Sequence, residues 1–268
     1  MRLSLSLLVL FTSLAFAEDP AVVMLSGQPL TLAHYSSSLP EPKATVLFLP
    51  GDGGWRGLAV DLAKTIASWG FDVYGFDTKV YLEKHSRGGL QLSLSQMAGD
   101  IRKTAEAVGA KPDRKVLLMG WSQGAGMAVA AVSGERPARI AGVLMLGLPE
   151  TAVLGWDWKA TLAVLAHQEP NQPTFPIKPL LGGSAGVPVW MIYGSDDEYT
   201  NPAKAQGLYR SANSPKQFRL IDGANHRFDG HLAELYTSIK EGLSWICTER
   251  PSASAVIFRS QWPSYWLG

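Results

Sequence analysis

Lys115–Val132 reads KVLLMGWSQGAGMAVAAV, and the interpretation of the whole chain depends on this stretch. The apolar run Val116–Met119 predicts a buried strand, and the small residues of Ala125–Val132 predict a helix. Between them stands GWSQG, a G-x-S-x-G sequence centred on Ser122. Strand, G-x-S-x-G and helix in this order are typical of a nucleophile elbow, a sharp turn that presents a serine hydroxyl at the end of a strand. Glycine is required at both ends because a side chain there would collide with the adjoining strand or helix.

The same pattern occurs a second time, as GGSAG at Gly182–Gly186. This copy precedes the apolar run Val187–Tyr193 and has Pro188 at the entry of that run. It therefore predicts a loop that leads into a strand, whereas an elbow leaves one. The context favours Ser122 over Ser184 as the nucleophile.

Elsewhere, apolar strands alternate with amphipathic helices. Besides the elbow, strands are predicted at 44–49, 71–76, 140–146, 187–193 and 217–221, two short edge strands at 21–24 and 30–35, and helices at 56–69, 93–108, 202–210 and 228–247. This alternation predicts an α/β protein with a mostly parallel sheet covered by helices on both faces, as in the α/β-hydrolase fold. Residues 78–89 are polar and predict a loop, and residues 151–186 show no clear period and predict a cap-like excursion over the sheet.

The N-terminus predicts an exported protein. Met1-Arg2 is a short basic start, Leu3–Phe16 is apolar, and small residues precede a cleavage site after Ala17. This is the pattern of a signal peptide over residues 1–17, which leaves a single mature domain at 18–268. No later stretch is long and apolar enough to predict a membrane span.

Composition narrows the functional classes. The 268 residues suit one large α/β domain, and the net charge of +1 argues against nucleic-acid binding through bulk electrostatics. Cys247 is the one cysteine, which excludes an internal disulfide framework and is best interpreted as a buried thiol on the last helix. Export without disulfides favours a bacterial periplasm.

A serine nucleophile needs a base and a group that holds the base. Two strands after the elbow end in suitable residues, one at Gly194-Ser195-Asp196-Asp197 and the other at Asn225-His226. The order Ser, Asp, His is that of α/β-hydrolases. We predict that His226 is the general base and that Asp197 orients its ring, with Asp196 as the alternative acid.

The tetrahedral intermediate of ester hydrolysis needs backbone N–H groups that face its oxyanion. Gln123, directly after Ser122, is predicted to supply one, and the glycine-rich loop Pro50–Gly54 the other, at Asp52 or Gly53. No Gly-Lys-Ser/Thr follows this loop, so it is not predicted to be a phosphate cradle. This chemistry requires neither metal nor cofactor.

With these residues in view, the chain resembles the VirJ/AcvB family of periplasmic, virulence-associated α/β-hydrolases. The resemblance rests on LPGDGGW at Leu49–Trp55, YGFD at Tyr74–Asp77 followed by Tyr81, AGD at Ala98–Asp100, the elbow, and His226 with Phe228. It extends over about residues 44–247. It implies a serine esterase that removes the amino acid from aminoacyl-phosphatidylglycerol, with a phospholipid substrate at the periplasmic membrane surface.

That substrate carries an α-ammonium beside the scissile ester, so the pocket is expected to offer a negative charge. Asp52 and Asp77 follow strands that end at the same sheet edge as Ser122, and both are candidates for this contact. Trp121, next to the nucleophile, is also expected to contact substrate. Five aromatic residues are candidates for docking on the membrane: Trp156, Trp158, Phe175, Trp262 and Trp266.

Two other functions remain open at this point. One is an esterase, thioesterase or peptidase with another acyl substrate, and the other is a non-catalytic secretion adaptor that kept the fold. The sequence also leaves open which amino acid is released and the oligomeric state.

Overall fold

A computed structural model of the chain describes residues 21–87, 92–109, 114–134, 137–157, 159, 172–184 and 186–248. The predicted signal peptide lies outside the described residues, as do Trp158, Trp262 and Trp266 of the docking prediction.

Within the described residues the main sheet has eight strands in the order β1-β2-β4-β3-β5-β6-β9-β10. Their bounds are β1 Ala21–Leu25, β2 Gln28–Tyr35, β3 Thr45–Leu49, β4 Asp72–Gly75, β5 Val116–Trp121, β6 Ile140–Leu146, β9 Val189–Gly194 and β10 Lys216–Ile221. β1 and β2 form an antiparallel hairpin, β2 is antiparallel to β4, and every other pairing is parallel. The predicted α/β fold with a mostly parallel sheet is confirmed. The prediction of β2 as an edge strand is wrong, because β2 pairs with both β1 and β4.

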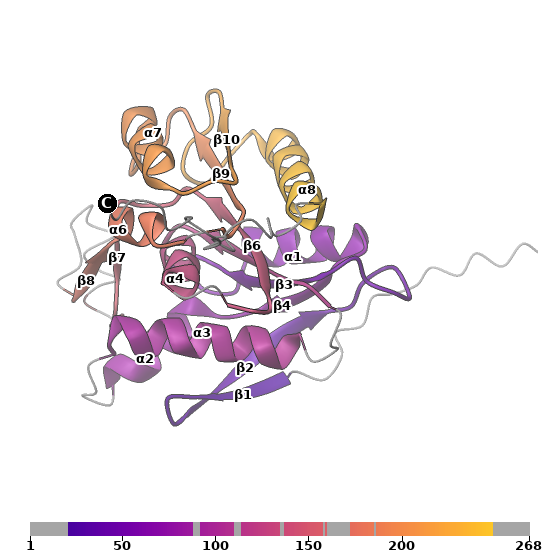
Figure 1. Cartoon of the computed structure of the whole chain (residues 1–268), viewed down its shortest axis with the longest axis vertical. Helices are drawn as coiled ribbons and strands as arrows, with labels where there is room; N and C mark the ends of the chain where they lie inside the picture. Colours follow the sequence, from indigo (N-terminus) through magenta and orange to yellow (C-terminus); the bar gives the residue numbers. More distant parts are fainter. Residues whose placement is uncertain are drawn as a thin grey trace, which may run out of the picture.

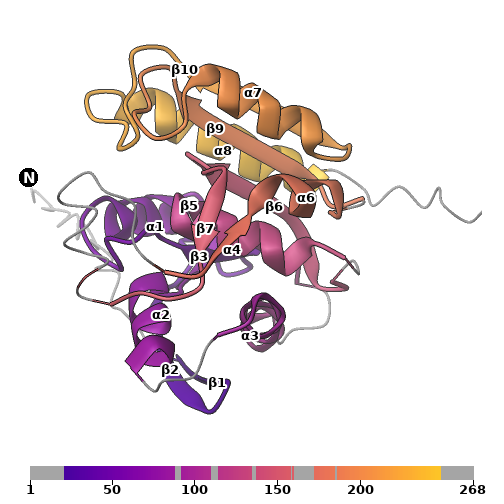
Figure 2. The same cartoon turned by 90° about the vertical axis from the view of Figure 1, so that its left-hand side faces the viewer.

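Helices cover both faces of this sheet (Figures 1 and 2). One face carries α1 (Leu58–Ser68) and α8 (Leu232–Thr248), and the other carries α3 (Leu94–Val108), α4 (Gln123–Val132) and α7 (Pro202–Ser211). Side chains of β3 alternate between the two cores: Val46 and Phe48 pack with α1, while Leu47 and Leu49 pack on the opposite face. Because both faces are buried, the central strands are continuously apolar, which is why they were recognisable in the sequence. Among the described helices, none combines the length and the apolar composition of a membrane span.

The loop predicted at 78–89 is wrong over the described part of that range, because Thr78–Arg87 forms helix α2. Asp77 Oδ1 accepts the N–H of Val80 at 3.0 Å, which is the contact of a helix N-cap. Tertiary contacts of one face of α2 stabilise this helix. Tyr81 is buried, and its hydroxyl donates to Asp100 Oδ2 of α3 at 2.8 Å. The polar composition of the segment concealed this buried face.

Between β6 and β9 the chain forms a small separate sheet of β7 (Thr151–Val153) and β8 (Thr174–Pro176), followed by α6 (Ile177–Gly182). Trp156 and Phe175 were predicted to dock on a membrane, and this prediction is wrong. They are 4% and 3% exposed and belong to the hydrophobic core. An aromatic residue that is already buried in the folded chain has no ring left to insert into lipid.

Candidate active site

Ser122 occupies the turn between β5 and α4, and its backbone has the strained conformation of a nucleophile elbow. Its φ and ψ are 53° and −119°, in a region that residues with a Cβ rarely adopt. The neighbouring glycines show why the turn needs this sequence. A Cβ on Gly120 would lie 2.4 Å from Ala125 Cα, and one on Gly124 would lie 2.1 Å from the carbonyl oxygen of Leu49. Both contacts are with backbone atoms, so neither glycine tolerates a side chain.

Ser184, the serine of the second G-x-S-x-G sequence, lies in a different setting. It follows α6 and precedes β9, as the sequence predicted. The side chain is fully buried, and its hydroxyl donates to the carbonyl oxygen of Leu181 at 2.7 Å. A buried hydroxyl that is hydrogen-bonded to the preceding helix α6 has no access to a substrate.

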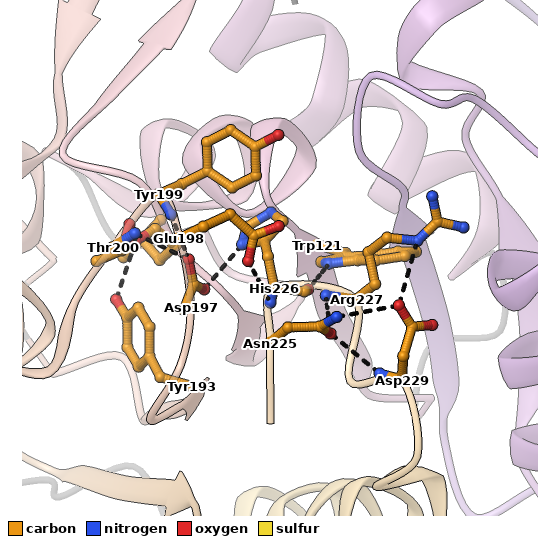
Figure 3. A network of polar contacts seen from close by, with 11 residues as sticks. Trp121, Tyr193, Asp197, Glu198, Tyr199, Thr200, Asn225, His226, Arg227 and Asp229 are labelled. Atoms are coloured by element: carbon orange, nitrogen blue, oxygen red, sulfur yellow. Dashed lines mark hydrogen bonds and ion pairs between the residues drawn. The ribbon is translucent and has the colours of Figure 1, made fainter. Parts of the chain in front are cut away.

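His226 and Asp197 are brought together by the loops after β10 and β9. His226 Nδ1 lies 2.8 Å from Asp197 Oδ2, and both side chains are buried (Figure 3). The other carboxylate oxygen, Oδ1, accepts the N–H groups of Tyr199 at 2.9 Å and Thr200 at 2.8 Å. Asp196, the alternative acid, is exposed and accepts the hydroxyl of Ser195 at 3.1 Å. The carboxylate that holds the imidazole is therefore that of Asp197.

These contacts determine the protonation of the pair. Burial on its own would raise the pKa of Asp197, but the hydrogen bond and charge of His226 and the two backbone N–H groups outweigh it and hold that pKa below its ordinary value. Asp197 is thus ionised at neutral pH. An ionised carboxylate keeps the imidazole proton on Nδ1, which leaves Nε2 of His226 as the basic nitrogen.

The loop of His226 lies against the elbow. Trp121 Nε1 donates to the carbonyl oxygen of His226 at 3.3 Å (Figure 3). Ser122 N donates to the carbonyl oxygen of Leu146 at 2.8 Å, and the next residue, Gly147, touches the imidazole, since a Cβ there would lie 2.8 Å from His226 Cε1. The end of β6 thus contacts both Ser122 and His226. The indole N–H of Trp121 thus holds the His226 loop, and the contact of this side chain with substrate stays a prediction.

Trp121→Phe is expected to lower kcat for an ester substrate about three- to tenfold with little change in KM, because one hydrogen bond that holds the His226 loop is lost. Steady-state kinetics on p-nitrophenyl acetate measures kcat and KM of the variant. Trp190→Phe is the control, since Trp190 is a tryptophan whose indole nitrogen has no hydrogen-bond partner among the described residues. Equal losses of kcat in both variants would contradict a role of the Trp121 N–H.

The start of α4 and the glycine-rich loop after β3 meet beside Ser122. Gln123 is the first residue of α4, so its N–H is one of the helix-terminal donors that have no acceptor within the helix. Gly51 lies so close that a Cβ there would be 3.4 Å from Ser122 Cβ. Asp52 and Gly53, the predicted second oxyanion donors, follow directly in this loop. The start of α4 and this loop therefore lie beside Ser122, and the choice of oxyanion donors stays a prediction.

Asp77 supports this loop. Its Oδ2 accepts the N–H of Trp55 at 3.2 Å, while its Oδ1 accepts that of Val80. Both carboxylate oxygens are therefore occupied by backbone donors, which favours a structural role over the predicted contact with substrate.

Residues that the sequence analysis missed form the exposed side of the site. Tyr199 is 54% exposed, and its ring stands edge-on to His226 with the centroids 4.8 Å apart. Glu198 Oε2 accepts the N–H of His226 at 3.1 Å. Partial burial, then the negative charges of Glu198, Asp52 and Asp197, raise the pKa of Tyr199. Glu198 and Tyr199 directly follow the Asp197 motif, and that adjacency was the available signal.

No group of His, Cys, Asp and Glu side chains suited to a metal ion occurs in the described part of the chain. Burial raises the pKa of the Cys247 thiol, which disfavours its thiolate.

Residues 43–244 match the family described as bacterial virulence protein (VirJ). The chain belongs to the VirJ family. Uncharacterized proteins from two strains of Mycobacterium tuberculosis are 25% identical to this VirJ chain over 187 residues, which is 68% of its length and 62% of theirs. The chain therefore spans less than two thirds of the length of these relatives.

Solved structures with the same fold include an esterase domain and a membrane phospholipase A. Est1E from Butyrivibrio proteoclasticus matches the VirJ chain with a TM-score of 0.62 and 15% identity, over 87% of this chain and 100% of that one. The esterase domain of a Rhodothermus marinus protein matches with a TM-score of 0.60 and 17% identity, over 85% and 97%. A membrane phospholipase A described as a bacterial virulence factor matches with a TM-score of 0.62 and 12% identity, over 86% and 87%. These likenesses show the α/β-hydrolase fold.

Proposed function

We propose that this VirJ-family protein is a serine ester hydrolase with Ser122 as nucleophile, His226 as general base and Asp197 as the group that orients the base. The observation that carries the proposal is the combination of the strained backbone of Ser122 with the buried 2.8 Å contact between His226 and Asp197 on the adjacent loop. A tight turn alone does not need a buried histidine that is held by an ionised aspartate on the adjacent loop.

The reaction follows from this arrangement. Ser122 Oγ attacks the ester carbonyl carbon while its proton moves to His226 Nε2. The resulting oxyanion accepts hydrogen bonds from the N–H of Gln123 and from that of Asp52 or Gly53. The C–O bond then breaks, and His226 gives the proton to the leaving alcohol. His226 then deprotonates a water, which attacks the carbonyl carbon of the acyl-enzyme. The C–Oγ bond breaks, His226 returns the proton to Ser122 Oγ, and the acid is released.

The proposed substrate is aminoacyl-phosphatidylglycerol in the periplasm, with phosphatidylglycerol as the leaving alcohol and the amino acid as the released acid. Membership of the VirJ family supports this choice, as does the likeness to the membrane phospholipase A. Asp52 provides the negative charge that an α-ammonium beside the ester requires. It is partly exposed and directly follows Gly51, which lies beside Ser122. Asp77 is less suited, because backbone donors occupy both of its oxygens.

Asp52→Asn is expected to lower kcat/KM about tenfold on an aminoacyl ester with a free amine, because a carboxylate partly shielded from water attracts the ammonium more strongly than an amide does. The same variant should act almost normally on the N-acetylated ester. Asp61→Asn, on the exposed side of α1, is the control and should leave both rates unchanged. Equal rates of the unmodified protein on free and acetylated esters would exclude recognition of the amine.

The proposed substrate is tested with vesicles of phosphatidylglycerol that contain lysyl- or alanyl-phosphatidylglycerol. The purified protein should release the free amino acid and leave phosphatidylglycerol, measured by mass spectrometry, and Ser122→Ala should release none. Intact lipid together with hydrolysis of p-nitrophenyl acetate would contradict the lipid substrate but not the ester hydrolase. Intact lipid and intact acetate ester would contradict both.

A further inference from the structure

The side-chain amide of Gln123 forms two reciprocal hydrogen bonds with the backbone of a single residue of β7. Gln123 Nε2 donates to the carbonyl oxygen of Val153 at 2.8 Å, and Val153 N donates to Gln123 Oε1 at 2.9 Å. The amide is buried, with Gln123 7% exposed. One edge of β7 pairs with β8, and on the other edge Gln123 takes the place of a neighbouring strand. The side chain next to the nucleophile thus hydrogen-bonds to the edge of β7 that does not pair with β8.

The segment Gly147–Trp156, which includes β7, contacts the site at several points. It begins at Gly147, whose Cα lies against the imidazole of His226. The carbonyl oxygen of Leu148 then accepts the hydroxyl of Tyr193 at 3.1 Å, which attaches the segment to β9. Ala152 packs on Gly126 of α4 so closely that a Cβ there would lie 2.7 Å from Ala152 Cβ. The segment therefore extends from the base to the helix that begins at Gln123.

We infer that Gln123 is a positioning residue that sets acyl selectivity. Its backbone N–H is the proposed oxyanion donor, and its side chain fixes the segment Gly147–Trp156. The segment is therefore held in place relative to the oxyanion hole. This inference rests on the proposed function, since it needs an acyl group at Ser122. The acyl carbonyl lies at the Gln123 N–H, and the rest of the acyl group extends past a segment held by the Gln123 amide. A long acyl group depends on the position of that segment, whereas an acetyl group hardly reaches it.

Gln123→Met tests the inference, because methionine has the length of glutamine without its donor and acceptor. The measured quantity is the ratio of kcat/KM for p-nitrophenyl decanoate to that for p-nitrophenyl acetate. Loss of the two hydrogen bonds leaves a buried N–H and C=O of Val153 without partners, so the segment should shift. We expect the ratio to change about tenfold, on the scale that pocket contacts give in substrate discrimination.

Ser184→Ala is the control, since it also disrupts buried side-chain-to-backbone hydrogen bonding, at the far end of the segment between β6 and β9. It should leave the ratio unchanged even if the melting temperature falls by as much as in Gln123→Met. An unchanged ratio in Gln123→Met, or equal changes in both variants, would overturn the inference.

A second measurement separates this inference from the proposed function. Amide hydrogen exchange of the peptide that contains Val153 should become faster in Gln123→Met and stay slow in Ser184→Ala, because the Val153 N–H loses its acceptor in the first variant only. Unchanged exchange at Val153 would overturn the role of Gln123 whether or not the protein hydrolyses esters. A protein without any ester hydrolysis but with faster exchange at Val153 would contradict the proposed function and the selectivity role, and leave Gln123 as a structural clamp.

Discussion

Ser122→Ala is expected to reduce kcat for ester hydrolysis by about 10⁴- to 10⁶-fold, the range found when the serine of a triad is removed. The physical reason is that no other hydroxyl of the elbow stands beside both the oxyanion donors and His226. Initial rates on p-nitrophenyl acetate and on aminoacyl-phosphatidylglycerol vesicles measure the loss. Residual hydrolysis should persist above the water rate, because the N–H groups near Ser122 still stabilise the oxyanion.

Ser184→Ala is the control for this result, since Ser184 has the same local sequence without the elbow geometry. Its cost should be about 1 kcal/mol of folding free energy for a buried hydrogen bond, with kcat nearly unchanged. Abolished activity in Ser184→Ala, with activity retained in Ser122→Ala, would show that the elbow was assigned to the wrong serine.

Asp197→Asn is expected to reduce kcat by about 10⁴-fold, because an amide at this position no longer keeps the imidazole proton on Nδ1. Asparagine can keep the shape of the site and still accept the N–H of Thr200, so the melting temperature should change far less than the rate. The experiment compares kcat and melting temperature in the same variant.

Asp196→Asn provides the matched control one residue away. Asp196 is exposed and contacts the neighbouring Ser195 hydroxyl through its side chain. Asparagine at this position should therefore keep kcat within about twofold of the unmodified protein, as is usual for surface substitutions. A loss in Asp196→Asn as large as that in Asp197→Asn would contradict the assignment of the orienting acid.

The strand ends were predictable from sequence because parallel strands place their carboxyl ends at one sheet edge. That rule predicted that Ser122, Asp197 and His226 lie together, and the G-x-x-D spacing favoured Asp197 over Asp196. The elbow glycines were equally predictable, since their requirement is local and steric. The chemistry-bearing positions of this fold thus follow from short motifs and their order along the chain.

Features that depend on tertiary contacts were not predictable. Helix α2 has a polar composition and is buried through Tyr81, whose partner Asp100 is 19 residues away. The pairing of Gln123 with Val153 joins residues 30 positions apart, and no local pattern marks either of them. For Trp156, residue type alone did not distinguish a buried aromatic from an interfacial one, and packing decided the outcome.

The conformation of the His226 loop was also not predictable from the sequence. The apolar pattern predicted a helix from Phe228, but α8 begins at Leu232. Asn225 Oδ1 accepts the N–H groups of Arg227 and Asp229, each at 3.0 Å, and Phe228 has a φ of 58°, so the chain turns before the helix starts. This turn presents His226 to Asp197, and it also places His231 before α8 and not inside it.

The most direct measurement of the central claim is fluorophosphonate labelling of the folded protein, with the modified residue located by peptide mass spectrometry. A Ser122 that is activated by His226 and Asp197 should form the adduct, Ser122→Ala should prevent it, and His226→Ala should slow it by orders of magnitude while the melting temperature remains close to that of the unmodified protein. Absence of an adduct on Ser122 in the folded protein, or labelling that is equally fast in His226→Ala, would contradict a serine hydrolase and favour a protein that kept the fold without the chemistry.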